Sequence, residues 1–355
     1  MDWDSLCFNT ATFIAGIFVL DYGADKFVDH TVVVGQRVGI SPTLIALLTA
    51  GAEYEELAVV VAAILQHRAP LALGNVIGST ISNILGAFSL GLLCHPGRME
   101  FDWTAKMYSA LLLAVTTLVV GLAFFDQLNQ PTGGVLIAIF ALYLISIGYA
   151  IYRGIAEPPQ MSDSDSEDDV PASRSHQMPS EEDPLLSTPN SPSPEDGRNI
   201  SRPLYYHLFQ LLFGLFALSL SGYILAHSAG TIADSLHLSG TVFGLTIIAF
   251  ATTLPEKFIS VLSGFRGQGG IVVAATAGSN IFLLTLCIGI VAASGGAVDQ
   301  ADAFVLFDLV TVWMSAFFLA VVVFLRPPSR ISGLVLLAAY LVFLVLEFSL
   351  YKKRL

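Results

Sequence analysis

Two glutamates, Glu56 and Glu256, stand inside apolar segments of the sequence, 200 residues apart. Ionisable side chains in apolar segments are energetically costly, so they usually mark an ion pathway or a buried ion pair. A further carboxylate, Glu53, lies one helical turn before Glu56, and two hydroxyls, those of Thr252 and Thr253, precede Glu256. Carboxylate, hydroxyl and carbonyl oxygens are the ligands that a hard cation such as Ca²⁺ prefers. These residue types therefore predict an all-oxygen site for a metal cation.

A second set of polar side chains lies in the apolar segment that follows each glutamate. Ser79 and Ser279 each follow a glycine, and the first of these segments also holds Asn75 and Asn83. Asn75, Ser79 and Asn83 recur at a spacing of four, so on a helix they share one face. Two roles stay open for the serines. They can be ligands, or together with their glycines they can be contacts where helices pack closely.

The helix that carries Glu256 must be interrupted, because Pro255 directly precedes this glutamate. A proline inside a helix removes a backbone hydrogen bond and frees a carbonyl. Free carbonyls at membrane depth are tolerated only where protein or a water-filled cavity satisfies them. The freed carbonyls would add oxygen ligands beside the carboxylate. The alternative role for Glu56 and Glu256 is a structural ion pair, for example with Lys257.

Membrane helices must position these residues, because the composition is that of an integral membrane protein. The 355-residue chain is 54% apolar and 12% charged, with a mean hydropathy of +0.72, whereas a soluble domain is about 45–50% apolar and about 25% charged. Its apolar runs are long enough to cross about 30 Å of hydrocarbon. They lie at residues 10–29, 38–65, 70–94, 105–124, 132–152, 204–229, 240–265, 270–295, 302–325 and 331–351.

The arrangement of these runs predicts a duplicated architecture. An odd number of spans on each side of a polar stretch makes the second half enter the membrane from the opposite side, as in the inverted repeats of secondary transporters. A constant offset matches Glu56 with Glu256 and Ser79 with Ser279. We therefore predict an all-α membrane protein with ten transmembrane helices in two inverted five-helix repeats. The predicted units are a first repeat at 1–156, a disordered acidic Ser/Pro-rich linker at 157–203 and a second repeat at 204–355.

The stretch between the halves is acidic and rich in serine and proline. Residues 157–202 hold eleven acidic residues against three arginines and so supply −8 of the net charge of −12. This composition predicts disorder. Lysines and arginines number eleven in the loops on the linker side against four on the other, which favours a cytosolic linker. Ser162, Ser164 and Ser166 resemble phosphorylation sites, and Glu181–Leu186 resembles an acidic dileucine sorting signal. These motifs predict kinase and adaptor contacts and a vacuolar or endosomal membrane in preference to the plasma membrane.

The segments around the two glutamates also resemble a known family. GAEYEELAVVVAAILQHRAPLALGNVIGSTISNIL and ATTLPEKFISVLSGFRGQGGIVVAATAGSNIFLL are similar to the two alpha repeats of the cation/calcium exchanger superfamily. Members typically read G-T-S-L-P-E and then G-N-x-x-G-S-N in each repeat. The resemblance implies alternating access about a central site for Ca²⁺ or another divalent cation, with protons or Na⁺ as counter-ion and no resident cofactor. The ligands it implies are chiefly Glu56 and Glu256, helped by Thr252, Thr253, Ser79, Ser279 and Asn83.

The sequence departs from the family pattern at several positions. Ala52 and Glu53 stand where Thr and Ser are usual, Glu55 replaces a proline, and Lys257 stands where an apolar residue is usual. Carboxylates one turn apart, at Glu53 and Glu56, repel each other when both are charged, which favours proton coupling over sodium coupling. Exposure to water at a kink is an equal alternative for Glu53 and Glu55. Lys257 lies too deep to reach water comfortably, so its ammonium must find partners inside the protein.

Two other functional classes have to be weighed against transport. In the second repeat Ala274 and Ala275 replace the family's Gly-Asn, and Leu283 stands where a polar residue is usual. If these departures abolish transport, the protein is an ion sensor or scaffold with an exchanger fold. An intramembrane enzyme is disfavoured, because the sequence has no HExxH motif, no Ser/His pair at a shared depth and no paired membrane aspartates. Asp21, Asp308 and Glu347 are lone charges in other spans and are expected to be paired or to lie near an interface. The prediction is a secondary-active cation antiporter and not an enzyme.

Overall fold

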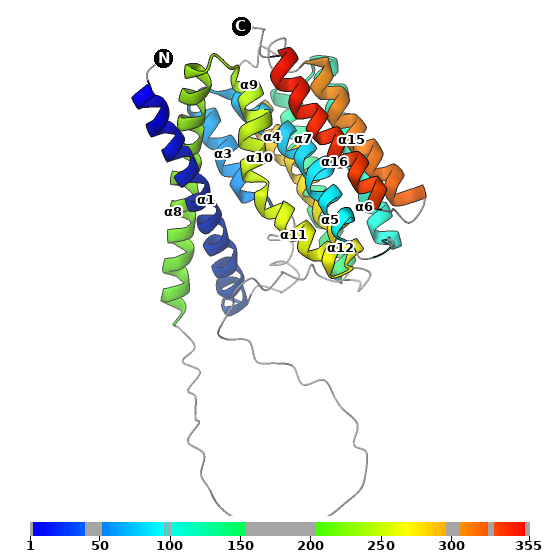
Figure 1. The fold of residues 1–355 in the computed structure, drawn as a ribbon. Coiled ribbons are helices and arrows are strands. Elements are labelled where there is room, and N and C mark those ends of the chain that lie inside the picture. Colours follow the sequence, from blue (N-terminus) through cyan, green and yellow to red (C-terminus); the bar gives the residue numbers. More distant parts are fainter. Residues whose placement is uncertain are drawn as a thin grey trace, which may run out of the picture.

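The computed structural model describes residues 3–39, 52–95, 97, 99, 101–152, 203–295, 305–325 and 330–351. In these residues all regular structure is helical, as the composition predicts (Figure 1). Residues 40–51, which belong to the predicted span at 38–65, lie outside the described part of the chain, and so does the predicted linker except for its last residue.

The helices follow the predicted apolar runs. In the first half they are α1 (Trp3–Arg37), α3 (Tyr54–Leu65), α4 (Ala69–Ile81), the π-helical segment η1 (Ser82–Phe88), α5 (Ser89–Cys94), α6 (Trp103–Phe124) and α7 (Gln130–Tyr152). In the second half they are α8 (Leu204–Ser235), α9 (Gly240–Phe243), η2 (Gly244–Ile248), α10 (Ala249–Thr252), α11 (Leu254–Phe265), α12 (Gly269–Phe282), η3 (Leu283–Cys287), α13 (Ile288–Ala293), α15 (Leu306–Leu325), α16 (Arg330–Leu346) and η4 (Glu347–Tyr351).

Within the described residues, eight helices are long and apolar enough to cross a membrane, when a helix continued through a π segment counts as one. Gly240–Thr252 and Leu254–Phe265 form a further span, bent by 47°. α3 covers the second part of the remaining predicted span. α1 contains the predicted first span, 10–29, and continues for about two turns beyond this apolar run at each end. Hydropathy reports the part of a helix that matches hydrocarbon, and not where the helix ends.

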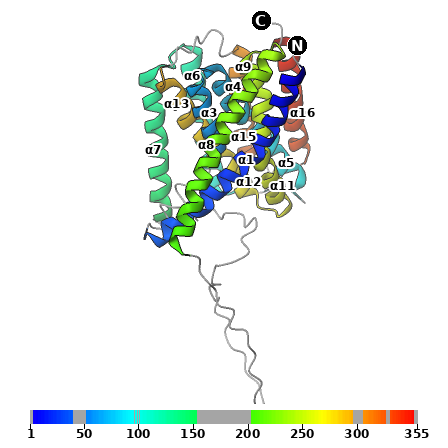
Figure 2. The same cartoon turned by 90° about the vertical axis from the view of Figure 1, so that its left-hand side faces the viewer.

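The described helices of the first half have counterparts in the second half, in the same order and at an offset close to 200 residues. α3 begins at Tyr54 and α11 at Leu254, and both are 12 residues long. α4 and α12 each pass into a π segment, at Ser82 and Leu283. The equivalent helices α1 and α8 lie side by side and run in opposite directions (Figures 1 and 2). The fold is therefore a pair of inverted repeats, as predicted.

The pair α1 and α8 lies on one side of the molecule and packs on the rest mainly through α3 (Figures 1 and 2). The span made of α4, η1 and α5 is the most buried of the described spans, and it packs against α9, η2 and α11. Around this centre α6 packs on α15, α7 on α13, and α16 on α5. Large apolar side chains on the outer helices are exposed, as expected of surfaces that face lipid; they include Phe18, Leu142, Ile145, Phe216, Leu334 and Val345.

The backbones of α1 and α8 touch where each helix has a glycine. A Cβ added at Gly23 would lie 2.7 Å from a backbone nitrogen of α8, and one added at Gly214 would lie 2.6 Å from a backbone nitrogen of α1. Small residues allow such close approach between membrane helices. Nearer the linker, the Nδ1 atoms of His30 and His207 lie 3.1 Å apart across the same pair. One of these two nitrogens must donate and the other accept.

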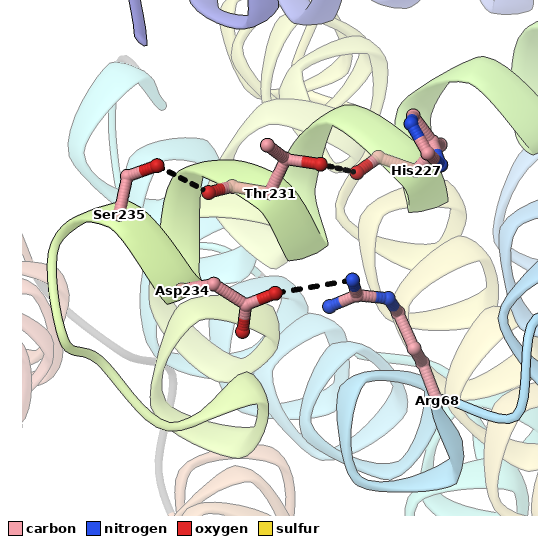
Figure 3. A network of polar contacts seen from close by, with 5 residues as sticks. All are labelled: Arg68, His227, Thr231, Asp234 and Ser235. Carbon is pink, nitrogen blue, oxygen red and sulfur yellow. Dashed lines mark hydrogen bonds and ion pairs between the residues drawn. The ribbon is translucent and has the colours of Figure 1, made fainter. Parts of the chain in front are cut away.

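A surface ion pair joins the two halves near the end of α3 (Figure 3). Arg68 follows α3, and its Nη2 donates to Oδ2 of Asp234 on α8 at 3.1 Å. Gly230 leaves room for the guanidinium, because a Cβ added there would clash with it. The hydroxyls of Thr231 and Ser235 donate to carbonyls one turn earlier in α8 (Figure 3). Thr231 and Ser235 thus form bonds within α8, and Asp234 is the residue in this network that binds Arg68.

We expect Asp234→Asn to lower the free energy of unfolding by less than about 1 kcal/mol, because exposed ion pairs contribute little in water. The Asp234 side chain is 68% exposed. Thermal unfolding of the detergent-solubilised protein should show a small loss at low salt that disappears at high salt. The matched control is Asp126→Asn, because Asp126 is an exposed acid without an ion pair among the described residues. A loss of several kcal/mol at both salt concentrations would contradict the expectation.

Candidate cation site

The N-terminus of α3 gathers three carboxylates. Glu53 precedes the helix, Glu55 and Glu56 lie in its first turn, and one carboxylate oxygen from each lies within 4.8 Å of the others. Opposite ligands of a single Ca²⁺, each at about 2.3–2.6 Å, are separated by a similar distance. Glu56 is completely buried and Glu53 nearly so. The positive end of the helix dipole stabilises negative charge at this position. The start of α3 therefore both positions the carboxylates and lowers the cost of their charge.

The second half repeats this construction. The helix breaks at Thr253, between α10 and α11, and Glu256 lies in the first turn of α11. Pro255 occupies the same turn, where its missing N–H removes no helical hydrogen bond. The predicted interruption is confirmed. The Glu256 carboxylate is close enough to those of Glu53 and Glu56 for their charges to repel, so the two halves contribute to one cluster.

Several oxygens of this cluster have no hydrogen-bond partner. Both carboxylate oxygens of Glu56, and Oε2 of Glu53 and of Glu256, are buried without one. Buried polar atoms in folded proteins nearly always have a partner, so these oxygens fit the coordination of a cation. The alternative, a structural ion pair, is not formed in the described part of the chain, where the one ion pair joins Arg68 and Asp234.

α4 and η1 present a row of buried polar groups. Asn75, Ser79 and Asn83 are all buried, and the side-chain amide of Asn75, the hydroxyl of Ser79 and the carbonyl oxygen of Asn83 have no partner. Nδ2 of Asn83 donates to Oγ of Ser279 at 3.3 Å, which joins the polar rows of the two halves. Gly78 makes the close helix contact in this region, because a Cβ added there would meet the backbone of η2. Gly78 therefore serves the packing of α4 against η2, whereas the hydroxyl of the neighbouring Ser79 has no hydrogen-bond partner.

The two threonines before Glu256 differ in their contacts. The hydroxyl of Thr252 donates to a carbonyl one turn earlier at 3.1 Å. The hydroxyl of Thr253 also donates to a carbonyl one turn earlier, and it accepts from the ammonium of Lys257. Lys257 donates in addition to Oγ of Ser82 at 2.8 Å and to the carbonyl of Thr253 at 3.1 Å. The ammonium finds its partners inside the protein, as its depth predicts, and none of these partners is a carboxylate.

Some residues beside the cluster could not be singled out from the sequence. Ser82 contacts Lys257, and its Oγ lies 3.0 Å from the hydroxyl of Tyr340 on α16. Both are remote from Lys257 in the chain, so no local pattern indicates them. The sequence left exposure to water as an equal alternative for Glu55. In the structure its carboxylate lies with those of Glu53 and Glu56. The π segments η1, η2 and η3 interrupt the central spans, and such segments often occur at functional sites.

Two of the lone charges form a separate pair. Asp308 on α15 and Glu347 in η4 are both buried, and their side chains interact with each other. The backbone N–H of Val305 donates to Oδ2 of Asp308 at 3.3 Å. Two carboxylates do not neutralise each other as an ion pair does, so the expectation that these residues are paired or lie near an interface stays a prediction. Neither of them belongs to the carboxylate cluster at α3 and α11.

The chain is similar to known proteins along most of its length. Residues 8–148 and 206–349 match the family of the sodium/calcium exchanger protein. The putative antiporter CaxA of Alkalimonas amylolytica is 29% identical over 350 residues, which are 95% of this chain and 97% of that protein. The sodium/calcium exchanger MaX1 of Methanosarcina acetivorans is 24% identical over 96% of this chain and 98% of its own.

The fold is similar to that of the sodium-calcium exchanger NCX_Mj. The two structures align with a TM-score of 0.57 at 20% identity, over 96% of this chain and 98% of the other. The family match covers both halves and leaves out the stretch between them. The carboxylate cluster lies within the matched residues. We conclude that the chain belongs to the sodium/calcium exchanger protein family.

Proposed function

We propose that this protein is a secondary-active antiporter that exchanges Ca²⁺, or another divalent cation, for protons or Na⁺ by alternating access. The observation that carries the proposal is the meeting of Glu53, Glu56 and Glu256 at the starts of two symmetry-related helices, with carboxylate oxygens that are buried and unpartnered. The names of the relatives, a putative antiporter and a sodium/calcium exchanger, support it.

The charge of the cluster gives a physical reason for coupling two ions. Carboxylates confined in an apolar environment repel one another strongly, because charges interact more strongly where the dielectric constant is low. A bound divalent cation offsets this repulsion. After the cation leaves, protons or Na⁺ must offset it, since uncompensated charge inside a membrane is costly. If the site can change the side of the membrane to which it opens only when its negative charge is compensated, it moves one ion in exchange for the other.

The inverted halves supply the second requirement, which is access from alternate sides. In transporters built from inverted repeats, one bundle rocks against another around a fixed site near the middle of the membrane. Here α3 begins directly after Glu53, and the helix of the second half breaks at Thr253, so both points lie next to the cluster. We propose these two points as the places at which the neighbouring helices change their direction during the cycle.

The location that we propose is a vacuolar or endosomal membrane, with the linker in the cytosol. The motifs that suggest it, Ser162 to Ser166 and Glu181–Leu186, lie outside the described residues. Contacts of the linker with kinases and sorting adaptors belong to the same proposal.

The proposal predicts uptake of radiolabelled Ca²⁺ by liposomes that contain the purified protein. Uptake should require an outward gradient of protons or of Na⁺, and each gradient imposed alone identifies the counter-ion. Protein-free liposomes are the control, and competition by unlabelled divalent cations defines selectivity. Binding of Ca²⁺ without uptake under either gradient would overturn the transport proposal and indicate an ion sensor.

A further inference from the structure

Lys257 brings a positive charge into the centre of the protein and surrounds it with neutral oxygens. Lys257 is buried, with 8% of the residue exposed. The ammonium donates to Oγ of Ser82, to the carbonyl of Thr253 and to the hydroxyl of Thr253, and it lies 4.9 Å from the ring centre of Phe250. An ammonium has three donors, so each one can be satisfied without a carboxylate.

These oxygens are held in place by other parts of the fold. The hydroxyl of Thr253 donates its own hydrogen to the carbonyl of Ala249, so it turns its lone pairs towards Lys257. The carbonyl of Thr253 lies at the break before α11 and receives only a long backbone bond, 3.4 Å from the nitrogen of Lys257. Oγ of Ser82 lies 3.0 Å from the hydroxyl of Tyr340. Backbone carbonyls freed at a helix break are ligands that transporters use for Na⁺, and the two hydroxyls add further neutral oxygens beside that of Thr253.

The position of this charge relates it to the transport site. Lys257 follows Glu256 directly and interacts electrostatically with Glu256, Glu56 and Glu53. The equivalent residue in the first half is the neutral Leu57, so the charge is not part of the duplicated pattern. It offsets the repulsion among the carboxylates, which is the task that the proposed function otherwise gives to a mobile monovalent ion.

We infer that the ammonium of Lys257 occupies a pocket for a monovalent cation, formed by Ser82 and Thr253, and acts there as a tethered ion. The antiporter then moves one coupling ion fewer for each divalent cation than it would with a small neutral residue at this position. The inference rests on the proposed function for its effect on coupling, whereas the pocket itself can be tested by binding.

The test compares Lys257→Ala with the wild type and with Lys257→Met. Alanine removes the ammonium and leaves space among the oxygens, whereas methionine removes the charge but fills the space. In liposomes held at zero membrane potential, the ratio of Ca²⁺ concentrations across the membrane at which net flux is zero reports the number of coupled ions. A tenfold Na⁺ gradient should shift this ratio about tenfold further in Lys257→Ala than in the wild type, because each additional coupled ion contributes one factor of the gradient. Lys257→Met should show no such additional shift.

An equal zero-flux ratio in Lys257→Ala and the wild type would overturn the inference and make Lys257 a structural hydrogen-bond partner. If the wild type carries no divalent cation, the proposed function fails, and calorimetric titration with Na⁺ then decides about the pocket. Lys257→Ala should bind one Na⁺ more than the wild type, and Lys257→Ala with Thr253→Val should lose it. Lys257→Ser is the second variant if Lys257→Ala does not fold. If neither neutral variant, Lys257→Ala or Lys257→Ser, binds additional Na⁺, the inferred pocket is refuted.

Discussion

Glu56→Gln and Glu256→Gln should each reduce uptake of divalent cations by about 100-fold or more. Each change keeps the shape of the side chain and removes one of the charges that face the cation. Removing one partner of a buried charge interaction typically costs about 3–5 kcal/mol, and about 1.4 kcal/mol corresponds to a factor of ten in affinity. Initial rates of gradient-driven uptake of radiolabelled Ca²⁺ in liposomes measure the effect.

The same substitutions should leave the ion-free protein at least as stable as the wild type. Glu53, Glu56 and Glu256 repel one another when charged, and an amide relieves part of that repulsion. Loss of transport together with an unchanged or raised melting temperature separates a loss of ligand from misfolding. Asp126→Asn makes the same chemical change at an exposed turn and should leave uptake unaffected. Near-normal uptake by either glutamine variant would refute the assignment of these glutamates.

Gly78→Ala should destabilise the protein by about 3 kcal/mol, at the upper end of the range for overpacked cores. An added Cβ would lie 2.6 Å from the Cβ of Ala249 and closer still to the carbonyl oxygen of Leu245. These are atoms of the backbone or next to it, so the clash cannot be relieved by turning a flexible side chain. α4 would have to move away from η2, and the row of polar groups on α4 would move with it.

Gly121→Ala is the matched control for Gly78→Ala. Gly121 also lies within a helix, α6, but nothing lies within 4 Å of the Cβ that it would acquire. Alanine is a better helix former than glycine by up to about 1 kcal/mol, so this variant should be neutral or more stable. Thermal unfolding in detergent, with gel filtration to detect aggregates, compares the two variants. Equal melting temperatures would show that the α4–η2 contact is looser than the structure indicates.

Much of the fold could be predicted from the sequence, because lipid imposes a simple rule on it. A segment that crosses hydrocarbon must be apolar and must satisfy its own backbone, so the apolar runs gave the helices to within a few residues at most ends. The break before Glu256 could be predicted from Pro255, since the proline ring is incompatible with an uninterrupted helix. The duplicated glutamates indicated which two helix starts meet.

The sequence did not indicate the surroundings of Lys257. Burial required that its ammonium be satisfied inside the protein, but carboxylates nearby in sequence were obvious candidates as partners. The choice of Ser82 and Thr253 depends on how α11 packs against η1. The π segment η1 was also unforeseen, because the span that contains it is buried on nearly all sides, so it has no polar face whose shift would reveal an inserted residue. The partners of Lys257 and the π segment therefore depend on tertiary packing, which local residue spacing does not predict.

The paired helices α1 and α8 also carry information about the bilayer. At 1.5 Å per residue, α1 is about 52 Å long, whereas a bilayer with its headgroups is about 40–45 Å thick. Aromatic and charged side chains mark membrane interfaces. They occur on this pair at Trp3 and again around the contact of His30 with His207, a separation of about 40 Å along the helix. We therefore expect the two headgroup layers near these levels, with the last two turns of α1 at the membrane surface on the side of the linker.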